Sequence, residues 1–248
     1  MIEKGILVAA DANIEWLLAW WWERYSSCNT LPVVFVDFGM TPESLAWCRE
    51  KGEVIPFDKP SFCKPLSKEA GIEAEQIYGK SCFQARNAWF KKPSACLLSP
   101  FSKTLWLDLD CEVLSSLDSV FLFLEHGREL AVNYGYAENL PKVLEKASAV
   151  GTVCNSGVFL FSKGSQLLQK WEKIALEESD RYLGDECILS TLLAESLETV
   201  SFLPEEYNWR MCRGVPVNAK IIHWKGEWGK KYILKHGGLK NLLPACFL

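Results

Sequence analysis

Apolar runs and amphipathic segments alternate along the whole chain. The runs at 5–10 (GILVAA), 32–39 (PVVFVDFG) and 105–107 (LWL) are short and continuous, which is typical of strands buried on both faces of a sheet. Similar runs predict further strands at 53–57, 129–134, 155–161, 199–204 and 220–224. Helices are predicted between these runs, around 16–22, 42–51, 83–90, 94–99, 165–178 and 186–195. This alternation predicts an α/β domain with a mainly parallel central sheet.

Local signals define the ends of one helix and leave another region irregular. Thr41 is a suitable N-cap, Pro42 fits the first helical position, and Gly52 can end the helix. Residues 58–80 contain Pro, Lys and Gly without a clear period, so we expect an irregular surface excursion there. Because no repeat, low-complexity segment or linker interrupts the chain, residues 1–248 are expected to form a single domain.

Composition and charge narrow the class of protein. The net charge of −4 argues against a general nucleic-acid binder. The apolar cluster at 16–22 is far shorter than the roughly 20 residues of a membrane-spanning helix, and the first residues lack the features of a signal peptide. Ten cysteines occur without a C-x-x-C pair, as expected for free thiols in a reducing compartment. These observations predict a cytoplasmic protein.

Two carboxylates follow the buried run at 105–107. Residues i and i+2 of an extended chain point to the same side, so Asp108 and Asp110 can converge on one point. Two anions held this close repel each other unless a cation lies between them, and a divalent metal ion is one such cation. The alternative is a solvated turn or the N-cap of a following helix. Ligands of α/β sheets bind outside the carboxyl ends of the strands, which favours the metal site.

The segment after the last predicted strand can complete such a site. Carboxylate oxygens suit Mg²⁺ or Mn²⁺, and one imidazole, here His223, favours Mn²⁺. Gly226 allows close approach of the backbone to an anion, and Lys230 and Lys231 can neutralise that anion. On its own, His223 is more often a structural histidine. The chain has no P-loop, G-x-G-x-x-G or G-x-S-x-G motif, so a diphosphate ligand would be held chiefly by the metal.

Five segments give the chain a family resemblance. ILVAADANIEW, LWLDLDCEVL, NSGVFLF, GDECILS and IIHWKGEWGKK occur in the order seen in glycosyltransferases of the GT-A fold. The chain most resembles the retaining family that contains glycogenin and bacterial lipopolysaccharide galactosyl- and glucosyltransferases, from residue 6 to about 230. The resemblance implies a single-domain GT-A fold, the Rossmann-like fold of nucleotide-diphospho-sugar transferases, with a mixed, mainly parallel sheet.

The resemblance also implies roles for individual residues at the nucleotide and the metal. The uracil and ribose would contact the turn after the first strand, and a glycine–lysine turn would contact the diphosphate. The implied nucleotide-binding residues are Ala9, Asp11, Asn13, Asp108, Gly226 and Lys230, and the implied metal ligands are Asp108, Asp110 and His223. In the family the lysine stands one residue earlier than Lys230 does here.

The implied sugar pocket contains one departure from the family. Asn155, Asp185 and Glu186 match the catalytic residues around the transferred sugar. Lys92, or alternatively Arg86, matches a basic residue that touches the sugar or the phosphate. The family commonly has glutamine where this chain has Glu186. A carboxylate there could act as a nucleophile or stabilise an oxocarbenium ion, or it could only hydrogen-bond a sugar hydroxyl.

These features together predict transfer of a hexose from a UDP-sugar to an acceptor hydroxyl, with Mn²⁺ or Mg²⁺ and with retention of configuration. The acceptor, which could be a glycan, a lipid-linked sugar or a protein, has no signature in the sequence. Alternatives are a non-catalytic sugar-nucleotide-binding or scaffold protein, a haloacid-dehalogenase-like phosphatase and a nucleotidyltransferase. The lysine-rich stretch 225–248 fits either peripheral docking on an anionic membrane or, more commonly, a helix packed on its own domain.

Overall fold

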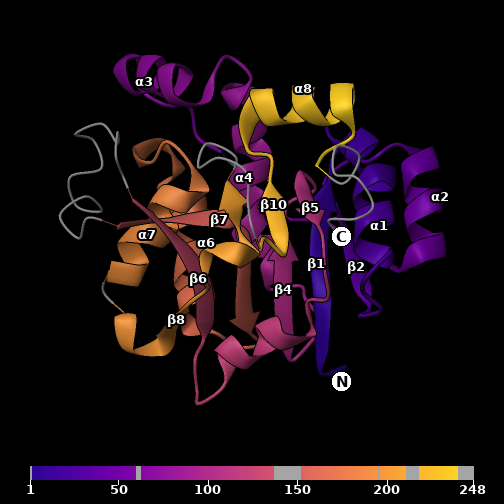
Figure 1. Ribbon diagram of the computed structural model, residues 1–248. Helices are drawn as coiled ribbons and strands as arrows, with labels where there is room; N and C mark the ends of the chain where they lie inside the picture. Colours follow the sequence, from indigo (N-terminus) through magenta and orange to yellow (C-terminus); the bar gives the residue numbers. More distant parts are fainter. Residues whose placement is uncertain (1, 60–62, 137–151, 195, 211–217, 240–248) are drawn as a thin grey trace.

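The computed structural model describes residues 2–59, 63–136, 152–194, 196–210 and 218–239. Its centre is a seven-stranded sheet with the strand order β3-β2-β1-β4-β7-β6-β8 (Figure 1). Only β7 runs antiparallel to its neighbours, β4 and β6, among the described strands of this sheet. The strands are β1 Lys4–Ala10, β2 Val33–Asp37, β3 Glu53–Pro56, β4 Lys103–Leu107, β6 Leu130–Tyr136, β7 Thr152–Ser162 and β8 Val200–Phe202. The predicted mixed, mainly parallel sheet is confirmed.

A small second sheet lies at the carboxyl end of β4. It has the order β5-β10-β9, with β5 Cys111–Val113, β9 Trp209–Arg210 and β10 Ile221–His223. The helices are α1 Leu18–Ser26, α2 Pro42–Lys51, α3 Lys68–Tyr78, α4 Cys82–Cys96, α6 Gln166–Glu177, α7 Asp185–Ala194 and α8 Gly226–His236. Short 3₁₀ helices occupy Glu15–Leu17, Asp118–Leu124, Ser179–Arg181, Leu197–Thr199 and Glu205–Tyr207.

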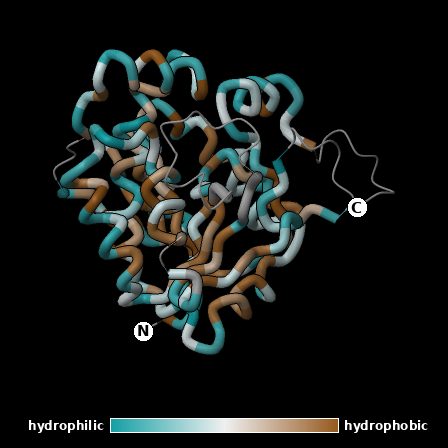
Figure 2. Tube along the Cα trace, turned by 90° about the vertical axis from the view of Figure 1, so that its left-hand side faces the viewer, coloured by the Kyte–Doolittle hydropathy of each residue, from teal (hydrophilic) through white to brown (hydrophobic). Residues whose placement is uncertain are grey.

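Alternating side chains of the central strands supply two separate apolar cores. On β4, Leu105 and Leu107 pack into the core shared with α1, whereas Trp106 packs into the core shared with α4, α6 and α7. All three side chains are at most 2% exposed, which confirms a strand buried on both faces. Figure 2 shows the same segregation, with hydrophobic strands inside and hydrophilic segments outside. The sheet is thus a rigid layer that presents its strand ends to one side.

The predicted ends of one helix are confirmed. Thr41 Oγ1 accepts the Ser44 N–H at 3.3 Å, Pro42 is the first residue of α2, and Gly52 follows its last residue. This arrangement leaves fewer unpaired N–H groups in the first turn.

Two expectations about the segment before β4 were wrong. Residues 58–80 are not wholly irregular, because Lys68–Tyr78 forms α3, whose N-cap Ser67 accepts the Ala70 N–H at 3.2 Å. The helices expected at 83–90 and 94–99 form a single helix, α4, with Pro93 inside it. A proline removes one helical hydrogen bond, and here burial of most of the helix's last turn outweighs that loss.

The C-terminal stretch is a packed helix over its described part. Gly229 and Ile233 of α8 are buried, whereas Lys231 and Lys235 are exposed. Residues 240–248 of this stretch lie outside the described residues, as do residues 137–151. Within the described ranges, no helix combines the length and apolarity required to span a bilayer.

Candidate functional site

A cavity of about 830 Å³ opens at the carboxyl ends of β1 and β4 and is lined in part by α4, α7 and α8. Every residue that the sequence predicted for the site lines this cavity except Arg86. Those that line it are Ala9, Asp11, Asn13, Lys92, Asp108, Asp110, Asn155, Asp185, Glu186, His223, Gly226 and Lys230. Residues far apart in the sequence therefore meet in one place.

Asp108 and Asp110 stand in a turn between β4 and β5, not in the extended chain from which their convergence was predicted. The Asp108 N–H donates to the Gly157 carbonyl at 2.8 Å, and the Trp224 N–H donates to the Asp110 carbonyl at 2.9 Å. These bonds tie the turn to β7 and to the segment after β10, so its backbone has little freedom.

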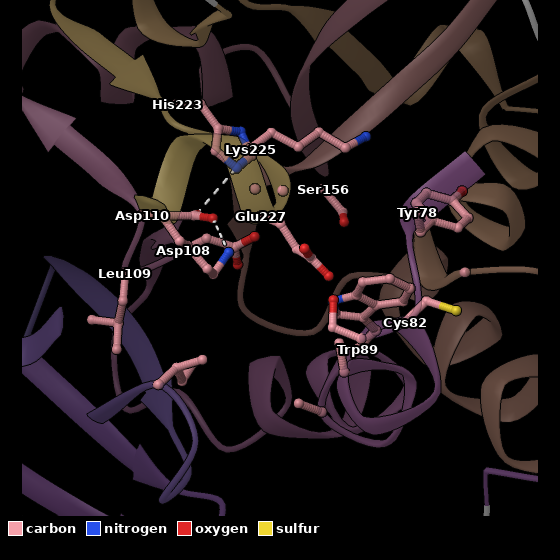
Figure 3. Close-up of a pocket in the computed structure, with 18 of the residues that line it drawn as sticks. Tyr78, Cys82, Trp89, Asp108, Leu109, Asp110, Ser156, His223, Lys225 and Glu227 are labelled. Atoms are coloured by element: carbon pink, nitrogen blue, oxygen red, sulfur yellow. Dashed lines mark hydrogen bonds and ion pairs between the residues drawn. The ribbon is translucent and has the colours of Figure 1, made fainter. Parts of the chain in front are cut away.

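The two carboxylates of this turn have different partners. Asp108 accepts the Trp106 indole N–H at 2.7 Å and pairs with Lys92 Nζ at 3.0 Å. Asp110 pairs with Lys230 Nζ at 2.6 Å and faces His223 Nε2 at 3.3 Å, as Figure 3 shows for the histidine. Although burial alone would raise it, the pKa of Asp110 is held well below its ordinary value by Lys230 and His223. Asp110 is therefore an anion in this cavity, and Lys230 is its cationic partner.

The orientation of His223 is set by two asparagines. Asn155 Oδ1 accepts the Gly157 N–H at 3.0 Å, so this atom of the carboxamide is the oxygen. The same oxygen lies 3.0 Å from His223 Nδ1, and Asn208 Oδ1 lies 3.1 Å from that nitrogen. Because both neighbours are acceptors, Nδ1 carries a proton and Nε2 is the nitrogen that faces Asp110. A cation between Nε2 and the carboxylate suits this geometry, so the residues present fit a divalent metal ion.

The room for His223 depends on a glycine in β7. A Cβ atom at Gly157 would lie 2.1 Å from His223 Cε1. Any other residue there would push the imidazole away from Asp110, so Gly157 belongs to the site although no sequence signal assigned it a role.

On the other side of Asn155 from His223, Glu186 is surrounded by donors. Lys225 Nζ lies 2.9 Å from one carboxylate oxygen, Asn155 Nδ2 donates to the other at 3.2 Å, and the Tyr78 hydroxyl is 3.5 Å away. Burial would raise the pKa of Glu186, but the Lys225 ammonium holds it below its ordinary value. Glu186 is therefore an anion in this cavity, and its partners Lys225 and Tyr78 were not predicted.

Lys92 lies between two carboxylates at the base of the cavity. Its Nζ is 3.0 Å from Asp108 and 3.6 Å from Asp185, and it donates to the Ser156 carbonyl at 3.0 Å. Burial opposes the ammonium, yet the two carboxylates hold the pKa of Lys92 above its ordinary value. Burial also raises the pKa of Asp185, which Lys92 partly offsets.

Arg86, the alternative to Lys92, is placed elsewhere. It is 3% exposed and donates to the backbone carbonyls of Ser179, Tyr182 and Leu183, just before α7. These bonds fix the entry of α7 into the site, so Arg86 acts on the fold and does not line the cavity.

The turn after β1 is held by its own side chains. Asp11 Oδ1 accepts the N–H groups of Asn13 and Ile14 at 2.9 and 3.2 Å. Ala9, Asp11 and Asn13 line the cavity next to the end of β1. They are far in sequence from the turn that carries Asp108 and Asp110.

A continuous chain of hydrogen bonds and ion pairs connects Lys225 with Lys230 across the cavity lining. It runs from Lys225 through Glu186, Asn155, His223 and Asp110 to Lys230. Among the described residues, six carboxylates and four lysines line the cavity, and each of these lysines pairs with at least one carboxylate. Such a cavity can bind a metal ion together with an anionic ligand, because these lysines can exchange their carboxylate partners for the anion.

No protein-family model and no curated protein matches the chain. Its fold is similar to that of solved glycosyltransferases. Galactosyltransferase LgtC, solved in complex with donor and acceptor sugar analogues, has a TM-score of 0.62 at 15% identity, with 93% of this chain and 94% of LgtC covered. Mouse xyloside xylosyltransferase 1 has a TM-score of 0.55 at 18% identity, with 90% and 97% covered. Glycosyltransferase GlyE of Streptococcus pneumoniae TIGR4 has a TM-score of 0.59 at 17% identity, and the chain spans 55% of its length. The GT-A fold predicted from the five segments is confirmed.

Proposed function

We propose that this chain, which has the GT-A fold of glycosyltransferases, is itself a glycosyltransferase that moves a hexose from a UDP-sugar to an acceptor hydroxyl. We propose further that one domain of residues 1–248 carries the activity, that it depends on a divalent metal ion, and that it retains the anomeric configuration. The solved similar structures include one with donor and acceptor sugar analogues bound, which supports a sugar donor and a sugar-like acceptor.

The observation that carries the proposal is the pairing of Asp110 with His223 and Lys230 in the cavity. This arrangement provides an oxygen and a nitrogen ligand for a metal ion, next to a lysine that can bind phosphate oxygens. Asp110 and His223 would hold the metal, and Asp108 faces the same cavity. When bound, the metal would supply Lewis-acid stabilisation of the leaving diphosphate.

The residues of the chain have separate tasks in this proposal. Lys230 leaves Asp110 when the metal binds there and pairs with the diphosphate. Lys92 keeps Asp108 and Asp185 in place and adds positive charge below the sugar. Lys225 screens the Glu186 carboxylate until the sugar occupies the pocket.

Glu186 offers two routes to retention. Its carboxylate can displace UDP from the anomeric carbon to form a glycosyl ester, which the acceptor oxygen then displaces while the hydroxyl proton passes to the released diphosphate. Alternatively, Glu186 can stabilise positive charge while the acceptor enters on the face that the diphosphate leaves. Replacing Glu186 by Gln separates them, because near-normal turnover of the variant would rule out the covalent route.

The described cysteines form no disulfide, which supports the proposed cytoplasmic location.

The first experiment is calorimetric titration of UDP into the protein with Mn²⁺ and then with EDTA, on wild type and on Asp110→Asn. We expect binding only with the metal and with Asp110 intact. Asp58→Asn, an exposed carboxylate that does not line the cavity, serves as the matched control and should bind as wild type. UDP release from a panel of UDP-hexoses then identifies the donor. No UDP binding in any condition would refute the proposal.

A second candidate, a sugar-nucleotide-binding protein without turnover, is favoured by one observation. Lys225 occupies both oxygens of Glu186, at 2.9 and 3.3 Å, where the family commonly has an uncharged glutamine. The same experiments decide between the two candidates. A binding protein without turnover would bind UDP but would not cleave UDP-hexoses to UDP.

A further inference from the structure

A buried carboxylate outside the cavity bonds to the chain at both ends of α8. Glu112 lies in β5, is 0% exposed and does not line the cavity. One of its oxygens, Oε2, accepts the indole N–H of Trp224 at 2.9 Å and the backbone N–H of Leu239 at 2.7 Å. Trp224 stands just before the first residue of α8 and its N-cap, and Leu239 stands just beyond the last residue. A single oxygen atom therefore ties both ends of this helix to β5.

The far end of α8 is fitted closely to this carboxylate. The Gly237 carbonyl, directly after the helix, accepts a hydrogen bond from the Arg24 guanidinium at 2.8 Å and one from the Trp20 indole at 3.0 Å. Gly238 has a φ of +88°, and a Cβ there would lie 2.6 Å from Glu112 Oε2. Arg24 also pairs with the other oxygen of Glu112, at 3.5 Å. Because a charged group is stable inside a protein only with partners, these contacts form one anchor for α8.

The helix held in this way carries lysines that line the cavity. It lies next to β5 and β10 (Figure 1) and contributes Gly226, Lys230 and Lys231 to the lining. Lys230 Nζ lies 2.6 Å from Asp110, which directly precedes β5, and Glu112 lies two residues further along. Both ends of α8 are thus fixed to the segment that carries the partner of Lys230. The backbone of α8 can stay in place while Lys230 changes that partner.

We propose that Glu112 is a positioning residue, which holds α8 against β5 so that Lys230 faces the carboxylate turn and the diphosphate bound there. The inference rests on the proposed function for the identity of that ligand. Glu112 is enclosed and does not line the cavity, so it acts on a ligand only through α8. Loss of the anchor should weaken the nucleotide binding that uses Lys230. It should not weaken metal binding by Asp110 and His223, which do not belong to α8.

The first test is a double-mutant cycle on UDP affinity at saturating Mn²⁺, measured by calorimetry on Glu112→Gln, Lys230→Met and the double variant. Glutamine fills the same space, but one amide oxygen cannot both accept the two N–H groups and pair with Arg24. We expect Glu112→Gln to weaken UDP binding at least about threefold in the wild-type background and to have no further effect beside Lys230→Met. Equal losses in both backgrounds, or a matching loss of Mn²⁺ affinity, would overturn the proposal, because Glu112 would then act only through general stability.

Glu129→Gln is the matched control for this cycle. The Glu129 carboxylate accepts the N–H groups of Gln166 and Leu167 at 2.8 and 3.2 Å, at the start of α6, and does not line the cavity. Its replacement loosens a different helix and should leave UDP affinity unchanged. Gly238→Ala disturbs the α8 anchor without changing Glu112, so it serves as a second variant if Glu112→Gln does not fold. Wild-type UDP affinity in Gly238→Ala would count against the proposal.

Hydrogen exchange separates this inference from the proposed function. Amides of α8 should exchange at least about tenfold faster in Glu112→Gln than in wild type, while those of α6 should change only in Glu129→Gln. Unchanged protection of α8 in a protein that binds UDP would remove the anchor and leave the proposed function standing. Faster exchange of α8 in a protein that never binds UDP would refute the proposed function and support the anchor.

Discussion

Asn155 determines which nitrogen of His223 faces the cavity. Its carboxamide oxygen receives the Gly157 N–H, and therefore the 3.0 Å contact with His223 uses the Nδ1–H. Nε2 is left to face Asp110 at 3.3 Å. The nitrogen of the same carboxamide donates to Glu186 at 3.2 Å. One side chain thus orients the proposed metal ligand and the proposed catalytic carboxylate together.

Replacing Asn155 by Ala should weaken metal binding although Asn155 is not a metal ligand. Without its oxygen, the imidazole can rotate and the Nδ1–H loses one of two acceptors, which typically costs about 10- to 100-fold in metal affinity. Calorimetric titration with Co²⁺ and Mn²⁺ measures this loss. Asn208→Ala removes the other acceptor and should act in the same direction. Unchanged affinity in the Asn155 variant would show that His223 needs no such support.

Replacing Gly157 by Ala should separate His223 from Asp110. A Cβ at this position would lie 2.1 Å from the imidazole, so the ring must move, and overpacking of this kind costs about 1–3 kcal/mol of stability. We expect metal-dependent UDP binding to be lost while the variant still unfolds cooperatively.

The matched control is Gly71→Ala in α3, where the new Cβ would lie 3.8 Å from its closest neighbour, an ordinary van der Waals contact. Because alanine is favoured over glycine inside a helix, this variant should gain about 0.5–1 kcal/mol and bind UDP as wild type. Full UDP binding by the Gly157 variant would refute the proposed role of its close approach to His223.

The sequence predicted the centre of the sheet well because the strands there, β1 and β4, are buried on both faces. The continuous apolar run at 105–107 has no polar alternative, and its burial decides its structure. By contrast, α3 has only one buried side chain, Ala74, and carries Gly71 inside it, a residue that disfavours a helix and made this segment look irregular. The short strand β5 also escaped prediction, because its pairing with β10 joins residues more than a hundred positions apart.

The residues predicted for the site, apart from Arg86, line one cavity, but their contacts were not predicted. Asp110 follows the carboxyl end of β4, as the sequence indicated, whereas His223 reaches it through β10 of the small sheet, which pairs antiparallel with β5. The distinct partners of Asp108 and Asp110 depend on a turn whose bonds come from β7 and from the segment after β10. Lys225 could have been noticed as a charge two residues after His223, but only the folded chain shows that it pairs with Glu186.

Removing Lys225 should change how stability depends on pH. In wild type, Lys225 holds the pKa of Glu186 below its ordinary value. The ion pair therefore stabilises the fold fully at pH values above the ordinary glutamate pKa. This stabilisation is lost as the pH falls through the lowered pKa of the folded protein. In Lys225→Met, burial acts without the ammonium and raises that pKa, so the carboxylate destabilises the fold at neutral pH.

The difference in melting temperature between wild type and Lys225→Met should therefore be largest near neutral pH and shrink below about pH 4. The double variant Lys225→Met with Glu186→Gln removes the titrating group and should lose this dependence. A difference that is constant with pH would show that Lys225 acts through packing alone.

Replacing Lys230 by Met should affect metal and nucleotide in opposite directions. Lys230 lies 2.6 Å from Asp110 and competes with a cation for that carboxylate, so its loss should raise the affinity for Mn²⁺ or Co²⁺ severalfold. In the metal-bound protein the same lysine is proposed to pair with the diphosphate. A charge-assisted hydrogen bond of this kind contributes about 1.5–3 kcal/mol, so UDP affinity at saturating metal should fall by at least about tenfold.

Lys231→Met provides the control for this pair of measurements, because it removes an equal charge from the neighbouring position of α8. Lys231 also lines the cavity, but it is exposed and pairs with Glu227 at 3.5 Å, not with Asp110. Its loss should change both affinities by less than about twofold, as is usual for exposed ion pairs. If Lys231→Met instead produced the loss of UDP affinity, the diphosphate would contact that lysine, and Lys230 would serve only to balance Asp110 until the metal binds.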